Sequence, residues 1–138
     1  MGSFSLIILH EKRMPRQNKI ILIVDDDSAD RELLREILKE EFKTRTVSSG
    51  YQAIQLLEKE NIDAVITNLM MPEMDGSELI IQIKDKSPDV PVVLVSGSFG
   101  DLAQKKKYEA YADFCIAKPI DPNVLISTVQ SIINDSGE

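Results

Sequence analysis

The chain has 138 residues and a formal net charge of −7 at pH 7, with 43% hydrophobic and 28% charged residues. These values are typical of one globular domain with its own core, and they argue against direct binding to nucleic acid or an anionic membrane, which relies on clustered Lys and Arg. The single cysteine, Cys115, cannot form an internal disulfide, so we expect a reducing, cytoplasmic location and a buried, unreactive thiol.

The first residues do not fit the pattern of the rest of the chain. The apolar run from Phe4 to Leu9 is too short for a signal-peptide core, and no stretch approaches the length of a membrane helix. We expect residues 1–17 to be an extension outside the fold, with residues 1–13 arising from cloning or from a start placed too early. The domain proper is expected over residues 18–135. The only histidine, His10, lies in the extension, so no histidine-based catalysis or metal site is expected.

After this extension, short β-rich runs alternate with amphipathic helical stretches. Ile20 to Val24 is a continuous apolar run, typical of a strand covered on both faces. Ser28 is the expected N-cap of the helix that follows. A weak strand over residues 45–47 precedes a helix that begins at a predicted capping box of Ser49 and Gln52. The inner faces of these two helices are predicted to comprise Leu33, Leu34, Ile37 and Leu38, and then Ala53, Ile54, Leu56 and Leu57.

The second half of the chain continues the same alternation. Strands are expected over residues 63–67, 92–96 and 114–117, and helices after Gly76, over residues 101–110 and after the cap formed by Asp121 and Pro122. The predicted inner residues are Leu79, Ile80 and Ile83 in the first of these helices, and Val124, Leu125, Val129, Ile132 and Ile133 in the last. Five strands in strict alternation with five helices predict an α/β fold, with a parallel sheet covered by helices on both faces in three layers.

Polar residues stand where the predicted strands end. Asp25 and Asp26 follow the first strand, Asn68 the third, Ser96 the fourth and Lys118 the fifth. In an open parallel sheet, functional groups gather at the carboxyl ends of the strands. We therefore expect these five side chains to meet at one edge of the sheet.

Each of these groups has a chemical interpretation and a plain structural alternative. Asp25 and Asp26, extended by Asp27, suit Mg²⁺, which prefers hard oxygen ligands, but such a run also forms a turn that favours the following helix dipole. Lys118 can place a point charge on a phosphoryl group, or it can be a solvated surface lysine. Ser96 can donate a hydrogen bond to a phosphoryl oxygen, or it can cap the turn that it begins.

Four sequence runs, IILIVDDDSADRELL, NLMMPEMDG, VPVVLVSG and AKP, occur in this order. They resemble the receiver domains of two-component response regulators, and the resemblance extends over roughly residues 18–135. It implies a flavodoxin-like, doubly wound sheet of five parallel strands, a (βα)5 sandwich. It also implies a signalling domain of a phosphorelay, not a metabolic enzyme, which takes a phosphoryl group from a histidine kinase with the help of Mg²⁺.

The resemblance also implies a role for each residue at the edge of the sheet. Asp25 and Asp26 correspond to the acidic pair that binds the metal, and Met70 to the residue whose backbone carbonyl faces it. Ser96 corresponds to the conformational-switch hydroxyl, and Lys118 to the lysine that contacts the phosphoryl group. The Lys118–Pro119 bond resembles one that is commonly cis in this family.

Two positions depart from the family pattern. Asn68 stands at the phosphoacceptor position, where the family has Asp. An aspartyl phosphate forms when a carboxylate oxygen attacks phosphorus, and a neutral amide is a far poorer nucleophile, so phosphoryl transfer should fail. The Asn68 amide oxygen remains a metal ligand, but Mg²⁺ affinity should be weakened. Cys115 replaces a family aromatic three residues before Lys118, and Phe114 should face the other side of the strand.

These departures leave two interpretations open. The chain is either a degenerate receiver that acts as a phosphorylation-independent interaction module, or an ordinary phosphoryl-accepting receiver in which Asp at position 68 has been replaced by Asn. A third class, a small flavin-binding or phosphate-handling enzyme on the same fold, is disfavoured. The sequence has no Gly-rich phosphate loop, only 5% aromatic residues and no Trp.

The resemblance also implies where partners bind. In receivers, the fourth helix, fifth strand and fifth helix commonly carry the contacts with a kinase, a phosphotransfer protein or an output protein. Here that face includes Lys105, Lys106, Lys107, Tyr108 and Tyr111. The lysines are either a solvated helix face or a docking patch for an acidic partner. We expect a monomer or weak homodimer, either a stand-alone receiver or a piece of a longer regulator.

Overall fold

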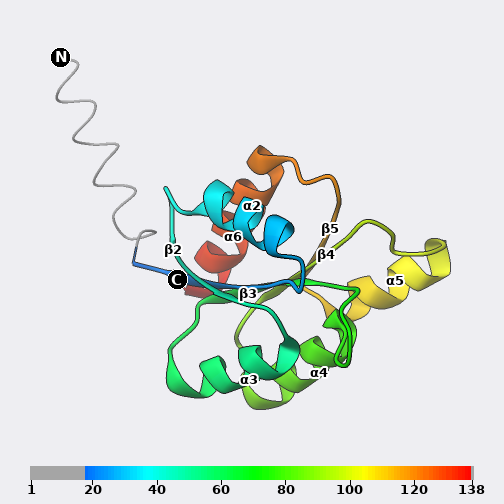
Figure 1. The fold of residues 1–138 in the computed structure, drawn as a ribbon, viewed down its shortest axis with the longest axis horizontal. Coiled ribbons are helices and arrows are strands. Elements are labelled where there is room, and N and C mark those ends of the chain that lie inside the picture. The colour runs from blue at the N-terminus through cyan, green and yellow to red at the C-terminus, as the bar shows by residue number, and fades with distance from the viewer. Residues whose placement is uncertain (1–17, 138) are drawn as a thin grey trace.

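A computed structural model describes residues 18–137, so the predicted extension at residues 1–17, with His10, lies outside the described residues. The described chain forms one sheet of five parallel strands in the order β2-β1-β3-β4-β5 (Figure 1). The strands are β1 (Ile20–Val24), β2 (Lys43–Val47), β3 (Ala64–Asn68), β4 (Val92–Ser96) and β5 (Phe114–Ala117).

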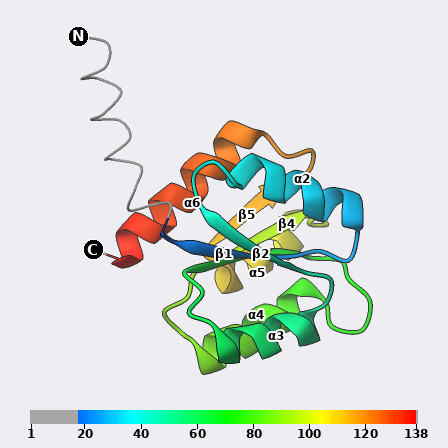
Figure 2. The same cartoon turned by 60° about the vertical axis from the view of Figure 1, so that its left-hand side comes forward.

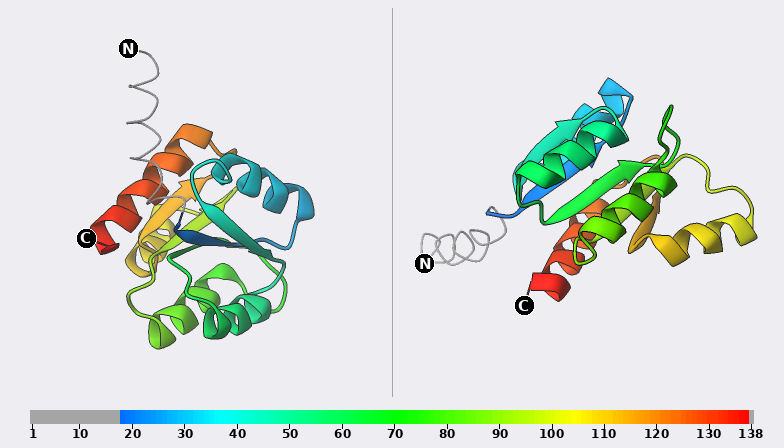
Figure 3. Two further views of the ribbon diagram at one scale, coloured as in Figure 1. Left: turned by 90° about the vertical axis from the view of Figure 1, so that its left-hand side faces the viewer. Right: turned by 90° about the horizontal axis from the view of Figure 1, so that it is seen from below.

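Within the described residues, five helices alternate with these strands and cover the sheet on both faces. They are α2 (Ser28–Leu38), α3 (Gly50–Lys59), α4 (Gly76–Lys86), α5 (Leu102–Tyr111) and α6 (Pro122–Gly137). Helices α2 and α6 lie on one face of the sheet, and α3 and α4 lie on the other (Figures 2 and 3). The predicted three-layer α/β fold is therefore confirmed. Within residues 18–137, no helix is both long enough and apolar enough to cross a membrane.

The sheet has a hydrophobic core on each face, because successive side chains of a strand point to opposite sides. In β1, Ile21 and Ile23 join the core beneath α2 and α6, and Leu22 and Val24 join the core beneath α3 and α4. All four are fully buried. Complete burial of such a side chain contributes about 1.5–3 kcal/mol, which explains why this strand reads as a continuous apolar run.

The starts of two helices differ from the sequence prediction. Asp27, not Ser28, caps α2, and its carboxylate accepts hydrogen bonds from the backbone N–H groups of Ala29 and Asp30. Ser49 caps α3 as predicted, but the predicted capping box is absent. The Gln52 side chain instead accepts from the backbone N–H of Ser48 at 2.8 Å. Capping boxes form at α4, between Asp75 and Glu78, and at α5, between Asp101 and Gln104.

Two predicted core residues are exposed. Leu33 of α2 and Val124 of α6 are 50% and 46% exposed, so their placement on the inner faces was wrong. The buried stripe of α2 runs through Leu34 and Leu38, and Leu33 lies one position, about 100°, away from it. Cys115 is half-buried against the core beneath α4, and Phe114 is 48% exposed.

Helix α5 is the least anchored helix of the sheet. None of its residues is buried, and Figure 1 shows it projecting beyond β4 and β5. Its main anchors are the capping box at its start and the half-buried Tyr108, whose ring lies 6.1 Å from that of Phe99 between centroids. A helix of this length is marginal in water unless an apolar face packs against the protein. Helix α5 therefore contributes little to the cooperative core.

We expect hydrogen exchange to distinguish α5 from α4. The two helices are similar in length, but α4 buries Leu79, Ile80 and Ile83, and α5 buries nothing. Local opening should therefore expose the amides of α5 at lower free energy, with protection factors at least about tenfold smaller than in α4. The measurement is native-state amide exchange followed by NMR. Equal protection in the two helices would contradict this description of α5.

Gly76 fixes the distance between α4 and the end of β3. Its backbone N–H donates to the Leu69 carbonyl at 2.8 Å, and a Cβ atom here would overlap the Asn68 carbonyl oxygen and lie 2.9 Å from the Leu69 Cα. We predict that Gly76→Ala lowers the free energy of unfolding by roughly 1–3 kcal/mol through overpacking. Urea denaturation measures the change. Gly97→Ala is the matched control, since no atom lies within 4 Å of its added methyl group, and similar losses in both variants would refute the prediction.

Candidate functional site

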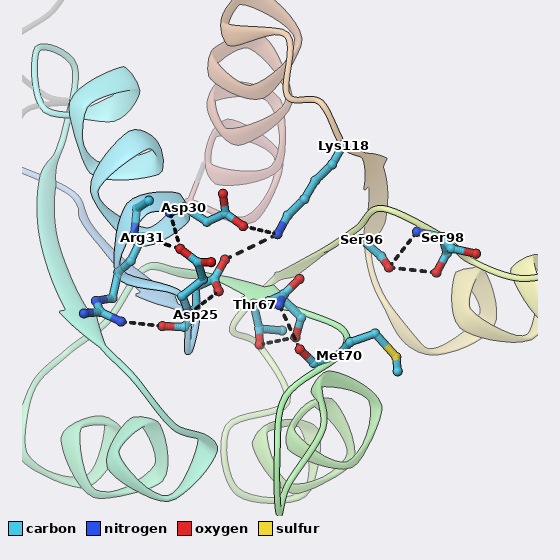
Figure 4. A network of polar contacts seen from close by, with 11 residues as sticks. Asp25, Asp30, Arg31, Thr67, Met70, Ser96, Ser98 and Lys118 are labelled. Atoms are coloured by element: carbon cyan, nitrogen blue, oxygen red, sulfur yellow. Dashed lines mark hydrogen bonds and ion pairs between the residues drawn. The ribbon is translucent and has the colours of Figure 1, made fainter.

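The strand register brings the predicted residues to one edge of the sheet. Val24 of β1 pairs with Thr67 of β3, so Asp25 emerges beside Asn68. Asn68 in turn pairs with Val95, and Ser96 pairs with Ala117 at the end of β5. Figure 4 shows Asp25, Ser96 and Lys118 around this carboxyl edge.

Asp25 is a buried carboxylate with one oxygen that accepts no hydrogen bond. The residue is fully buried, and its Oδ1 accepts a hydrogen bond from the backbone N–H of Asp27 at 2.9 Å. Its Oδ2 has no hydrogen-bond partner among the described residues, and the Lys118 ammonium lies 3.6 Å away. Burial raises the pKa of Asp25, although the Asp27 N–H and Lys118 oppose the shift. The charged carboxylate is thus incompletely stabilised, as expected for a group that binds a cation.

Lys118 is held mainly by a residue that the sequence analysis did not select. Its Nζ donates to Asp30 Oδ2 at 2.8 Å, closer than to Asp25. Burial alone would lower the pKa of Lys118, but the hydrogen bond that it donates to Asp30 and the charges of Asp25 and Asp30 outweigh this effect and raise the pKa. Asp30 was missed because the prediction followed strand ends, whereas Asp30 lies in α2. An acidic residue one helical turn after Asp26 was the available signal.

The Asn68 side chain is hydrogen-bonded to the backbone carbonyl of Met70, the group that the family resemblance predicts to be a metal ligand. The Asn68 side chain is buried, and its Nδ2 donates to the Met70 carbonyl oxygen at 2.9 Å. The Thr67 hydroxyl donates to the Asn68 carbonyl at 3.0 Å. The side chain of an ionised aspartate at this position would have no hydrogen to donate. The amide therefore satisfies the Met70 carbonyl without a cation.

The Ser96 hydroxyl caps the turn that it begins, as in the structural alternative given for this residue above. The residue is buried, and its Oγ donates to the Ser98 carbonyl at 2.7 Å and accepts from the Ser98 N–H at 3.1 Å. In residues 18–137 it makes no hydrogen bond to Asn68 or to the Lys118 side chain. Its backbone carbonyl accepts from the Lys118 N–H at 2.8 Å, which joins the ends of β4 and β5. The Lys118–Pro119 bond is cis, as predicted.

The loop after Asn68 is exposed at Met70 and packs against the start of α3 at Met74. Met70 is 70% exposed, and Glu73 adopts φ of 67°, a left-handed conformation that is uncommon for residues other than glycine. Met74 is buried against Gly50, where an added Cβ would lie 2.6 Å from its sulfur. The close approach to Gly50 lets Met74 fix the loop to α3.

The oxygen donors at this edge fit a weakly bound Mg²⁺. Asp25 offers a buried oxygen that lacks a hydrogen bond, and Asp26 is an exposed carboxylate with no ion pair in the described chain. Mg²⁺ commonly uses one or two carboxylates and keeps several waters. However, no cluster of three or more acidic, His or Cys ligands exists among the described residues. A metal that used the Met70 carbonyl would share that oxygen with the Asn68 amide N–H.

Comparisons with known proteins agree with this fold. Residues 21–130 match the family of response regulator receiver domains. The two-component response regulator ORR5 of rice, Oryza sativa subsp. japonica, is 36% identical over 107 residues, which span 75% of this chain and 80% of that protein. The signal receiver domain of a histidine kinase from Syntrophus aciditrophicus superposes with a TM-score of 0.79 at 31% identity, covering 88% of this chain and 94% of that one.

A receiver domain protein from Clostridium thermocellum superposes with a TM-score of 0.78 at 25% identity, covering 86% of this chain and 96% of that one. The fold is thus the flavodoxin-like fold of CheY-like domains. The chain belongs to the response regulator receiver family, whose members are signalling modules of two-component systems. Receiver domains generally bind Mg²⁺ at the phosphorylation site and interact with histidine kinases or phosphotransfer proteins and with output domains.

We predict that Asn68→Asp destabilises the metal-free protein. The new carboxylate would lie beside buried Asp25, whose pKa is already raised, and would lose the hydrogen bond to the Met70 carbonyl. The expected loss in the free energy of unfolding at pH 7 is roughly 1–2 kcal/mol. Urea denaturation in the presence of a chelator measures it. Asn61→Asp, at an exposed position, serves as a control for the added charge, and an unchanged or increased stability of Asn68→Asp would sink the prediction.

Proposed function

We propose that this protein is a degenerate receiver, a phosphorylation-independent interaction module that does not accept a phosphoryl group at Asn68 and is not an enzyme. The observation that carries the proposal is the state of the Asn68 amide, which is uncharged, buried and hydrogen-bonded to the Met70 carbonyl. An acyl phosphate requires attack by a carboxylate oxygen. A neutral amide is a far poorer nucleophile than a carboxylate, and its attack would not give a stable acyl phosphate.

The neighbouring groups support the same proposal. Lys118, the proposed phosphoryl contact, is paired with Asp30 and Asp25, and Ser96, the proposed switch hydroxyl, is bonded within its own turn. Asp25 and Asp26 would hold Mg²⁺, with the Asn68 oxygen and the Met70 carbonyl as further ligands if the amide turned. The metal would supply positive charge next to buried Asp25. We expect weak binding, because position 68 contributes no charge.

A second candidate is an ordinary phosphoryl-accepting receiver whose aspartate has been replaced by Asn68. The observation in its favour is that Asp25, Asp26, Ser96 and Lys118 lie together at the same edge of the sheet. Under this alternative, the single change of Asn68 to Asp would restore phosphoryl transfer. The two candidates therefore differ only in which residue, Asn or Asp, the natural protein has at position 68. Both use the same remaining site residues.

We propose that partners bind the surface formed by α5, β5 and α6. Lys105, Lys106 and Lys107 of α5 are exposed and have no ion pair in the described part of the chain. Tyr111 and Leu102 of α5 are also exposed. On a chain with net charge −7, these lysines would attract an acidic surface of a histidine kinase, phosphotransfer protein or output protein. We propose a cytoplasmic monomer or weak homodimer.

Incubation with radiolabelled acetyl phosphate and Mg²⁺ tests the proposed function. We expect no stable label on the chain with Asn68, because no carboxylate stands at position 68. Label on Asn68→Asp would show that the remaining groups are competent, and the Asn68→Ala variant should stay unlabelled under either candidate. Stable label on the Asn68 chain that survives in the Asn68→Ala variant would locate transfer elsewhere, and label lost in that variant would place it at Asn68. Either result would overturn the proposal.

A further inference from the structure

We propose that Asp30 is a positioning residue that serves as the counter-ion of Lys118 in place of a carboxylate at position 68. It holds the ammonium group between α2 and Asp25 instead of over the acceptor position. The inference deepens the proposed function, because it rests on Asn68 being the acceptor position of the family. It explains how a lysine at this edge remains ordered without the acidic partner that the family provides.

The contacts of the Lys118 ammonium carry the argument. Its Nζ lies 2.8 Å from Asp30 Oδ2 and 3.6 Å from Asp25 Oδ2, and Figure 4 shows the side chain extended toward these two carboxylates. Within residues 18–137 it makes no hydrogen bond to Asn68 or to the Ser96 hydroxyl. The lysine side chain is 23% exposed, so it needs a charged partner to offset its partial desolvation. A neutral amide cannot supply that charge.

The start of α2 holds Asp30 in place. Asp27 caps the helix and accepts from the backbone N–H of Asp30 at 3.1 Å. The Arg31 guanidinium donates to the Asp25 carbonyl at 2.7 Å and thereby ties the first turn of α2 to the end of β1. The carboxylate of Asp30 is therefore presented by a fixed backbone. The result is an alternating row of charges, Asp30, Lys118 and Asp25, that spans from α2 to the edge of the sheet.

With this pair in place, the principal polar groups at the edge have partners inside the chain. Asp30 pairs with Lys118, the Asn68 amide with the Met70 carbonyl, and the Ser96 hydroxyl with Ser98. Asp25 Oδ2 is the exception, with only the more distant lysine. A carboxylate introduced at position 68 would have to compete with Asp30 for Lys118. Asp30 and position 68 should therefore be energetically coupled, although one lies on α2 and the other at the end of β3.

A double-mutant cycle of Asp30→Asn and Asn68→Asp in the full chain tests this coupling. In the Asn68 background, Asp30→Asn should raise the unfolding equilibrium constant, measured in urea at pH 7 with a chelator. In the Asn68→Asp background, Asp30→Asn should raise the unfolding equilibrium constant by a factor that is at least about threefold smaller. The reason is that the carboxylate introduced at position 68 can then pair with the Lys118 ammonium. Glu32→Gln, an exposed acid on α2 that pairs with Arg35, should have equal effects in both backgrounds.

Acetyl phosphate labelling adds a readout that a purely structural role would not change. In Asn68→Asp, the introduced carboxylate oxygen bonds to phosphorus while the bond from phosphorus to the acetyl oxygen breaks, and acetate leaves with the electron pair. Addition of Asp30→Asn should raise the initial labelling rate about threefold or more, since Lys118 becomes free to stabilise the charge on the transferring group. Glu32→Gln should not change the rate.

The two experiments separate this inference from the proposed function. Label on the chain with Asn68 would overturn the proposed function, and the stability cycle would still decide the role of Asp30. Additive effects of the two substitutions in urea would overturn the role of Asp30, whatever the labelling shows. An unchanged labelling rate on adding Asp30→Asn to a labelled Asn68→Asp chain would overturn it as well.

Discussion

The buried carboxylate of Asp25 imposes the main physical constraint on this receiver. The register between β1 and β3 places it at the edge of the sheet with no exposure to water, and burial of a charged oxygen is costly unless a cation lies nearby. Lys118, at the end of β5, provides that cation at 3.6 Å. Lys118 is itself partly desolvated, and the Asp30 carboxylate is its closer partner. The first turn of α2 is therefore part of the site.

Asn68 satisfies a different requirement of the same edge. Its N–H group donates to the Met70 carbonyl, which an ionised aspartate cannot do, and it adds no negative charge beside Asp25. A receiver with aspartate at this position depends on Mg²⁺ or lysine to offset the additional charge. The amide removes that dependence. This is the physical basis for proposing a receiver whose conformation does not depend on phosphoryl transfer.

The edge of the sheet is continuous with the surface proposed for partners. Ser96 begins the segment that leads into α5, and Lys118 begins the segment that leads into α6. Helix α5 buries none of its residues, so a bound partner could cover its apolar and aromatic side chains without disturbing the core. Receiver domains act as signalling modules, and the weakly anchored α5 beside β5 suits a module that binds other proteins.

The sequence by itself determined the elements and their order, because apolar runs such as Ile20–Val24 and the stripe of Leu79, Ile80 and Ile83 report local burial directly. It also placed Asp25, Asn68, Ser96 and Lys118 at one edge, since parallel strands end on the same side of a sheet. Only the tertiary structure decided the partners of these groups. Asp30 lies 88 positions from Lys118, and Leu33 is exposed although its neighbour Leu34 is buried, because pairing and exposure depend on how α2 packs against the sheet.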